Sequence, residues 1–203
     1  MAKRKNSGKK GSAFEREICK SLSFWLTNGK RDDIFWRTAG SGARAETRKK
    51  VGKETAFQNG DLAFIDPIGE TYLRFFFVEI KKGYNKHLDI LSFVDKAGKH
   101  QILKAWLNKA CKQRRPGQII QLIVKRDLRK TFVVIESVCF VLLENQIGVY
   151  PYRSIQINDN GFDVMVLNYD EFYTWFKPEH LKRLLDIQAD WILSFKQNLL
   201  GDE

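Results

Sequence analysis

A strongly apolar run, Phe75-Phe76-Phe77-Val78, leads directly into Glu79-Ile80-Lys81, and this junction constrains the chain more than any other feature. Residues two apart in a strand point to the same face, so Glu79 and Lys81 would emerge side by side. The residues before them are apolar on both faces, which is typical of a central strand. Charges at the end of a buried strand need partners. We therefore expect a polar site here, rather than the solvated Glu–Lys pair of an exposed strand.

Asp61 adds a second carboxylate upstream of this strand. Between Asp61 and Glu79, residues 66–70 read Asp-Pro-Ile-Gly-Glu, a turn signal flanked by apolar stretches. The pattern predicts strands over 61–66 and 72–81 joined as a hairpin, which would bring Asp61 opposite residues 76–79. Two carboxylates and an ammonium would then converge at one strand end. This arrangement suits holding Mg²⁺ against a phosphate.

The charge of the chain indicates its partner. With 203 residues and 43% hydrophobic content, the chain can build one sizeable core or a core with an appended subdomain. Its net charge of +11 favours a polyanion. Basic residues concentrate in segments 1–11 and 43–53, on either side of the expected first helix, and such clusters beside a metal-type site favour nucleic acid over solvated tails. The expected DNA contacts here are Lys3, Arg4, Lys5, Lys9, Lys10, Arg44, Arg48, Lys49 and Lys50.

Cysteine use and hydropathy exclude several classes of protein. Cys19, Cys111 and Cys139 are far apart, show no zinc spacing, and are odd in number, which argues against a disulfide framework. We expect them to be reduced core residues. The N-terminus lacks the apolar segment of a signal peptide, and no apolar stretch is long enough to cross a bilayer. These features predict a cytoplasmic protein without a membrane partner.

The N-terminal third carries two more candidate elements. A helix is expected from Ser12, as N-cap, to about Thr27, after a disordered basic arm over 1–11. Glu15 lies at the start of its inward face, where it can close a capping box with Ser12, face a metal site, or do both. A short strand over 34–37 precedes a basic loop whose glycine amides could meet a phosphate. The loop has no Walker A spacing, so nucleotide hydrolysis is not indicated.

The remaining elements follow from periodicity and turn residues. The pattern predicts a helix over 98–112, strands over 118–125 and 131–136, an apolar run of uncertain type over 138–143, a hairpin from 153–158 and 162–167, a helix opened by Asn168, and another from Pro178 to near Leu200.

The order of these elements resembles the PD-(D/E)xK nuclease superfamily. Within it, Lys10-Gly11-Ser12-x-x-Glu15-Arg16-Glu17 and Arg37-x-x-Gly40-Ser41-Gly42, followed by Asp61 and Glu79-Ile80-Lys81, are similar to the archaeal-type Holliday junction resolvases. The resemblance covers roughly residues 9–136. It departs at Gly60, where the family usually has a proline, a change that affects backbone stiffness rather than coordination. A phage or mobile-element origin suits a small enzyme of this kind.

The resemblance implies a fold and a division of the chain. The fold would be α/β, with a restriction-endonuclease-like core in which helices flank a mixed central sheet. The nuclease core would span 12–136. Residues 137–203, which have no counterpart in the small archaeal enzymes, would form a C-terminal α+β extension packed on that core.

The resemblance also implies residue roles. Asp61, Glu79 and the carbonyl of Ile80 would coordinate Mg²⁺, for which Mn²⁺ would substitute, and Glu15 would hold a second or water-bridged metal. Lys81 would position or deprotonate the attacking water and stabilise the phosphorane. The family's loop residues near the scissile phosphate correspond to Arg37 and Ser41. The list of expected DNA contacts is completed by Arg16, Gln101 and Lys104.

The implied activity is Mg²⁺-dependent, structure-specific DNA cleavage, resolving four-way junctions by paired symmetric nicks. Two symmetric cuts imply a homodimer. One alternative is a nicking or repair nuclease acting on other branched or linear duplexes. Another is a basic nucleic-acid-binding protein that keeps the fold without catalysis, although the presence of all four residues Glu15, Asp61, Glu79 and Lys81 argues against it.

Overall fold

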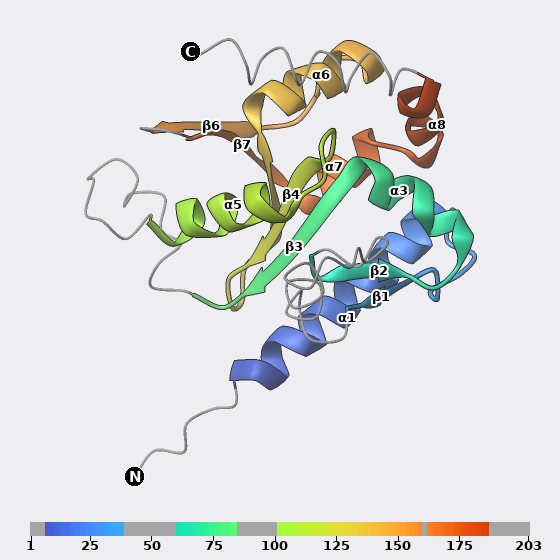
Figure 1. Ribbon diagram of the computed structural model, residues 1–203, viewed down its shortest axis with the longest axis horizontal. Coiled ribbons are helices and arrows are strands. Elements are labelled where there is room, and N and C mark those ends of the chain that lie inside the picture. Colours follow the sequence, from blue (N-terminus) through green and yellow to red (C-terminus); the bar gives the residue numbers. More distant parts are fainter. Residues whose placement is uncertain (1–6, 39–59, 85–100, 160–161, 187–203) are drawn as a thin grey trace.

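The computed structural model describes residues 7–38, 60–84, 101–159 and 162–186, and its centre is a five-stranded mixed sheet (Figure 1). The strand order is β3-β4-β5-β7-β6; β3 and β4 are parallel and the other neighbours antiparallel. The strands are β3 (Phe76–Lys82), β4 (Ile119–Lys125), β5 (Thr131–Glu136), β6 (Ser154–Asp159) and β7 (Phe162–Asn168). Helices flank the sheet, so the expected restriction-endonuclease-like α/β fold is confirmed.

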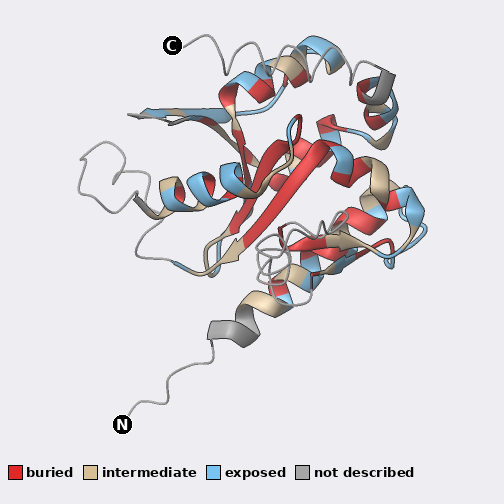
Figure 2. Cartoon of the chain, in the orientation of Figure 1, coloured by how far each residue is buried: buried red, intermediate tan, exposed pale blue. Residues whose placement is uncertain are grey.

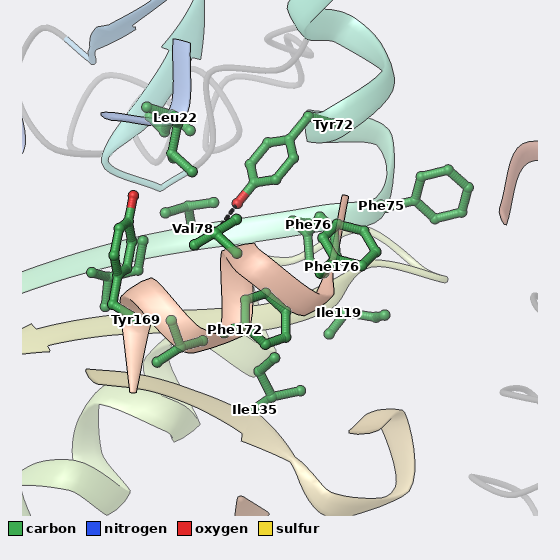
Figure 3. Packing of buried hydrophobic residues seen from close by; sticks show 14 of the residues in the cluster. Leu22, Tyr72, Phe75, Phe76, Val78, Ile119, Ile135, Tyr169, Phe172 and Phe176 are labelled. Atoms are coloured by element: carbon green, nitrogen blue, oxygen red, sulfur yellow. Dashed lines mark hydrogen bonds between the residues drawn. The ribbon is translucent and has the colours of Figure 1, made fainter. Parts of the chain in front are cut away.

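The two faces of the sheet are covered by different helices. Between the parallel strands β3 and β4, whose connection must cross over the sheet, the chain forms α5 (Gln101–Gln113). Apolar residues of α5 pack with Phe77 and with inward residues of β4 in one cluster. On the opposite face, Phe76 and Val78 pack in a larger cluster with α1 (Ser7–Leu26) and α7 (Tyr169–Trp175) (Figure 3). The alternation of β3 residues between the clusters is the two-residue period of a strand.

Strand β3 lies at the edge of the sheet, which corrects the expectation that it is central. All residues from Phe76 to Ile80 are nevertheless buried (Figure 2). The outer edge is covered by the chain at residues 60–61, where the amide of Asp61 donates to the carbonyl of Val78 at 2.9 Å. A strand buried on both faces therefore does not need a neighbouring strand on each side, because a short backbone contact covers the outer edge of β3 and gives the Val78 carbonyl a hydrogen-bond donor.

The expected hairpin between Asp61 and Glu79 is wrong. Strand β2 (Leu62–Phe64) pairs instead with β1 (Phe35–Arg37) in a separate antiparallel ribbon. A 3₁₀ helix, η1 (Pro67–Gly69), and then α3 (Glu70–Phe75) connect β2 to β3. The carboxylate of Asp66 accepts from the amide of Ile68 at 3.0 Å, so the turn signal caps a helix instead of reversing a hairpin.

Helix α1 begins at Ser7, earlier than the expected N-cap at Ser12. The last part of the expected basic arm, residues 7–11, is therefore helical rather than disordered. Lysines such as Lys9 and Lys10 are good helix formers and favour this earlier start. Since Ser12 lies inside the helix, the capping-box interpretation of Glu15 is wrong. Residues 1–6 lie outside the described ranges.

The C-terminal part of the chain completes the same sheet. Helix α6 (Ser137–Ile147) directly follows β5, so the uncertain apolar run is helical. The expected β6–β7 hairpin is confirmed, and β7 pairs with β5. The side chain of Asn168 caps α7 as expected, and α8 (Pro178–Asp186) begins at the expected proline. Up to residue 186, the expected extension therefore shares one sheet with the segment before it.

Two smaller expectations concern exposure. Cys19 and Cys139 are buried as expected, but Cys111 is exposed, because Ala110 rather than Cys111 faces the sheet from α5. In the ranges that the structure describes, no helix has both the length and the apolarity needed to cross a membrane.

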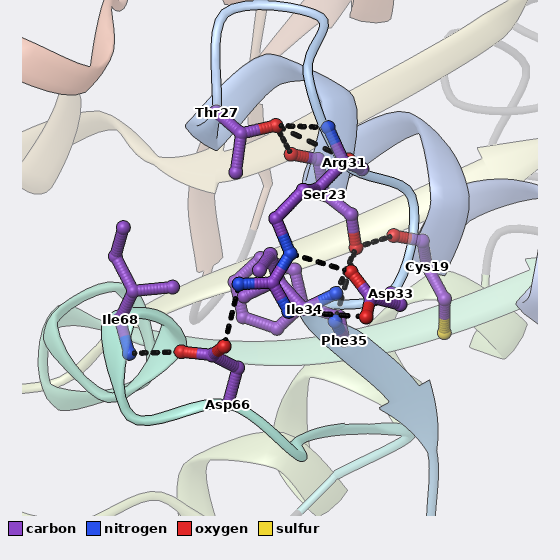
Figure 4. A network of polar contacts seen from close by, with 9 residues as sticks. All are labelled: Cys19, Ser23, Thr27, Arg31, Asp33, Ile34, Phe35, Asp66 and Ile68. Carbon is purple, nitrogen blue, oxygen red and sulfur yellow. Dashed lines mark hydrogen bonds and ion pairs between the residues drawn. The ribbon is translucent and has the colours of Figure 1, made fainter.

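A polar network fastens the β1–β2 ribbon to α1 (Figure 4). The fully buried hydroxyl of Ser23 accepts from the amides of Ile34 and Phe35 at 3.1 and 3.0 Å and donates to the carbonyl of Cys19 at 2.8 Å. On the surface, the guanidinium of Arg31 bridges Asp33 and Asp66. Because β1 ends in Arg37 and β2 starts directly after Asp61, this network also positions the candidate site.

Candidate active site

Two carboxylates and one ammonium meet on the edge strand β3. The Nζ of Lys81 lies 2.6 Å from Oε1 of Glu79 and 3.1 Å from Oδ2 of Asp61. Asp61 and Glu79 are each only 3% exposed. The structure thus brings together the three residues that the sequence placed at one strand end, although Asp61 arrives beside β3 by a route other than a hairpin.

The position of Asp61 depends on Gly60. Gly60 has φ +83°, and a Cβ there would lie 2.4 Å from the carbonyl oxygen of Val78. Only glycine combines this backbone conformation with so close an approach. Proline, which the family usually has at this position, could not adopt this backbone conformation, since proline fixes φ near −65°. The backbone conformation at residue 60 therefore requires glycine in place of the family's usual proline.

Backbone hydrogen bonds then fix the Asp61 carboxylate. The amide of Ile80 donates to Oδ2 of Asp61 at 2.8 Å, so the strand itself orients the carboxylate. On the other side, the hydroxyl of Thr38 donates to the carbonyl of Gly60 at 2.8 Å, and the amide of Thr38 donates to the carbonyl of Asp61 at 3.1 Å. Asp61 is held from both β3 and the end of β1.

Glu15 faces this group from α1, as the sequence predicted. Its Oε2 lies 3.0 Å from Nε of Arg37, an ion pair whose angles do not make a hydrogen bond. Burial, and then repulsion by the Asp61 carboxylate, raise the pKa of Glu15, while Arg37 and Lys81 oppose this rise. The raised pKa therefore reflects first the partial burial of Glu15 and second its closeness to the Asp61 carboxylate.

Lys81 is held in its charged form. Burial alone would lower its pKa, but the carboxylates of Asp61 and Glu79 outweigh burial and raise the pKa. In this arrangement Lys81 is an ammonium that can orient an anion or a water, and it is not poised to accept a proton.

Lys109 is a site residue that the sequence did not reveal. It lies on α5, is about half exposed, and places Nζ 3.7 Å from Oε1 of Glu79. The apolar spacing of Leu103, Leu107 and Ala110 shows which face of α5 is buried. How the helix sits along β3 depends on the crossover, and no local pattern encodes that.

The structure describes only some of the other residues that were expected to contact DNA. Arg16 is exposed on α1 and Lys104 is partly buried on α5. Lys9, Lys10 and Gln101 belong to described helices, but their side chains lie outside the description. The expected residues wholly outside the described ranges are Lys3, Arg4, Lys5, Ser41, Arg44, Arg48, Lys49 and Lys50.

The donor set fits a hard divalent cation in its chemistry. Among the described residues, no three His, Cys, Asp or Glu side chains are grouped closely enough to enclose an ion. Oxygens of Asp61 and Glu79 and the carbonyl of Ile80, 3.3 Å away, nevertheless all surround the Lys81 ammonium. Oxygen atoms gathered around one positive charge are the ligands that Mg²⁺ prefers. The ammonium occupies the point at which these residues stabilise positive charge.

Comparison with known proteins decides the family. Residues 6–183 match the family described as "Phage putative PDDEXK endonuclease". The chain belongs to this family. The superfamily and the phage connection expected from the sequence are thereby confirmed, and the matched range contains Glu15, Asp61, Glu79 and Lys81. It also extends through β7 and α7, so the family unit includes much of the expected extension. No curated protein and no solved structure matches the chain.

Proposed function

We propose that this nuclease is a divalent-metal-dependent, structure-specific endonuclease that nicks branched DNA, with the four-way junction as its preferred substrate. The observation that carries the proposal is the contact of Lys81 with both Asp61 and Glu79 at the covered edge of β3. An aspartate, a glutamate and a lysine in this order are the residues from which the family takes its name.

The residues that would hold Mg²⁺, or Mn²⁺ in its place, are Asp61, Glu79 and the carbonyl of Ile80. Glu15 would hold a second or water-bridged ion; burial and the neighbouring Asp61 carboxylate raise its pKa, and a bound cation would oppose that rise. When bound, the metal would neutralise phosphate charge and activate a water. The buried positions of Asp61 and Glu79 would keep these ligands fixed without reorganisation.

Cationic side chains would stabilise the reacting phosphate. Lys81 keeps its proton on Nζ and would orient the attacking water and face the negative charge that builds on the phosphorane. Arg37, about one-third exposed beside Glu15, would offer a planar guanidinium to a non-bridging oxygen. Ser41, in the loop that follows β1, would orient the phosphate or its water.

Binding of the DNA would rest on the basic surface around the site. The net charge of +11 provides a long-range attraction to a polyanion. Arg16 on α1 and Lys104 on α5 would contact the backbone on either side of β3, together with the basic residues of 1–11 and 43–53. Because a four-way junction is resolved by two symmetric cuts, the active form would be a homodimer. It would act in the cytoplasm of the infected host cell, where free cysteines persist.

A matched set of DNA substrates tests the proposal. Purified protein with Mg²⁺ is incubated with a four-way junction, a flap, a nicked duplex and a linear duplex built from shared strands. We expect paired, symmetric nicks near the junction centre at a rate well above that on linear duplex, and no cleavage in EDTA. Equal rates on all four DNAs would support the nicking nuclease instead, and cleavage that persists in EDTA would exclude the metal.

A further inference from the structure

The turn between β4 and β5 carries a leucine that its own packing does not explain. Leu128 is fully exposed, at 103% of the reference surface, and has φ +60°. A bulky residue in the left-handed region is uncommon, because asparagine or glycine adopts it at lower cost. Single exposed apolar residues are ordinary on protein surfaces, but this one combines lost burial with backbone strain.

The neighbours of Leu128 are mainly cationic. The segment reads Arg126-Asp127-Leu128-Arg129-Lys130, and both Arg129 and Lys130 are exposed. The turn therefore carries one apolar side chain at its tip, with cationic side chains beside it. Val149, another strongly exposed apolar residue at 84%, lies between Gly148 and Tyr150 with no basic neighbour. Exposure alone does not single out Leu128; exposure among cations does.

The register of the sheet places this turn beside the active site. Lys81 pairs with Val124 and Lys82 with Lys125 in the parallel β3–β4 ladder. The amide of Gly83 donates to the carbonyl of Lys125 at 2.9 Å, so the ends of the two strands are joined directly before the turn begins. The turn thus projects from the end of β4 that adjoins Lys81, and the strands can be followed in Figure 1.

We propose that Leu128 is an apolar wedge that enters the DNA at the branch point or at a base step while the scissile phosphate lies at Lys81. This inference rests on the proposed function, because it requires DNA at the site. Apolar side chains that enter a base step unstack it and bend the duplex. Bases at a branch point are already weakly stacked, so the wedge would favour branched over linear DNA. Arg129 and Lys130 would hold the flanking phosphates.

The test measures base stacking and cleavage separately. A four-way junction carries 2-aminopurine at its centre, and its fluorescence is followed on binding with Ca²⁺ replacing Mg²⁺; single-turnover cleavage is then measured with Mg²⁺. Leu128→Asn removes the apolar tip while keeping a residue that tolerates positive φ. Leu128→Met keeps an apolar tip, and Val149→Asn is the matched exposed control.

We expect the wild-type protein, Leu128→Met and Val149→Asn to raise the fluorescence. Leu128→Asn should bind without raising it and should cleave the junction roughly ten- to a hundredfold more slowly, the range set by burying one leucine side chain. A wild-type protein that cleaves while Leu128→Asn matches it in both readouts refutes the wedge and leaves the nuclease proposal intact. A wild-type protein that never cleaves, yet unstacks the base through Leu128, refutes the nuclease proposal and leaves the wedge intact.

Discussion

Replacing Gly60 by alanine should lower the stability of this protein and distort the proposed active site. The added methyl would lie 2.4 Å from the Val78 carbonyl oxygen, at a residue with φ +83°. Gly29, in the turn that follows α1, offers a matched control: its φ is +82°, but nothing lies within 4 Å of a Cβ built there. The two substitutions share the backbone penalty and differ in the steric one.

The size of the difference follows from the contacts around Gly60. An alanine in the left-handed region costs about 1–2 kcal/mol, which is the whole cost expected at Gly29. At Gly60 the chain must also move away from β3, which weakens the bond from the Asp61 amide to Val78 and the bond from the Ile80 amide to the Asp61 carboxylate. Two buried hydrogen bonds add about 2 kcal/mol, so we expect about 3–4 kcal/mol for Gly60→Ala.

Urea unfolding of both variants measures this difference, with single-turnover DNA cleavage beside it. Displacing Asp61 by about 1 Å should lower the cleavage rate about a hundredfold in Gly60→Ala, whereas Gly29→Ala should cleave normally. Equal losses of unfolding free energy in the two variants would refute the reasoning, since the close approach to Val78 would then carry no cost.

Three further predictions concern Ser23, His180 and Lys109. Ser23→Ala should lower the free energy of unfolding by about 2–4 kcal/mol, because two buried amides lose their acceptor; a loss below 1 kcal/mol in urea unfolding would contradict the role of the Ser23 hydroxyl. Burial lowers the pKa of His180, Arg183 and Lys177 act in the same direction, and Glu179 opposes them. The Nδ1 of His180 accepts from the amide of Lys177 at 3.1 Å. A lowered folded-state pKa means stability that is present above the unfolded pKa near 6.5 and is lost as the pH falls through the folded pKa, so wild-type stability should drop with acidification and His180→Gln should flatten that drop in a pH series of unfolding curves. Lys109→Ala should change the free energy of unfolding by no more than about 0.5 kcal/mol but weaken DNA binding, and it should reduce the slope of log affinity against log salt concentration by about 1. The control Lys182→Ala on α8 should change neither DNA affinity nor that slope. DNA titrations at several salt concentrations measure the slope, and an unchanged slope in Lys109→Ala would place Lys109 outside the interface.

The sequence predicted elements well where one local rule decides the structure. The Asn168 cap, the proline start of α8 and the β6–β7 hairpin each depend on residues within a few positions of one another. Phe76 to Ile80 were also correctly read as buried on both faces.

The errors arose where distant parts of the chain compete for the same residues. Residues 66–70 have the composition of a hairpin turn, but the carboxylate of Asp66 caps a helix and the β2 strand finds its partner in β1. Strand β3 is an edge strand because the backbone at Gly60 covers it, and a contact between residues so far apart in sequence has no local signature. Lys109 reaches Glu79 only through the crossover to α5 for the same reason.

The residues of the candidate site could be predicted from the sequence more accurately than the topology that brings them together. Asp61, Glu79 and Lys81 were identified from their chemistry and order, and they meet in the structure although the predicted hairpin does not exist. The chemistry of these side chains can be read from the sequence, whereas the path of the chain that brings them together depends on contacts between distant residues. The roles of the loop that contains Ser41 and of the basic segments outside the described ranges stay predictions.

In the proposed function, Asp61 and Glu79 flank the catalytic centre of the nuclease. Single-turnover cleavage of a labelled four-way junction by wild-type protein, Asp61→Asn and Glu79→Gln with Mg²⁺ tests it most directly, with binding of the same DNA measured in Ca²⁺. We predict that each substitution lowers the cleavage rate about a hundredfold or more, since a fixed charged ligand is lost, while the DNA binds as tightly as before or tighter, since repulsion of phosphate is reduced. Normal cleavage by either variant would contradict the assignment of this site.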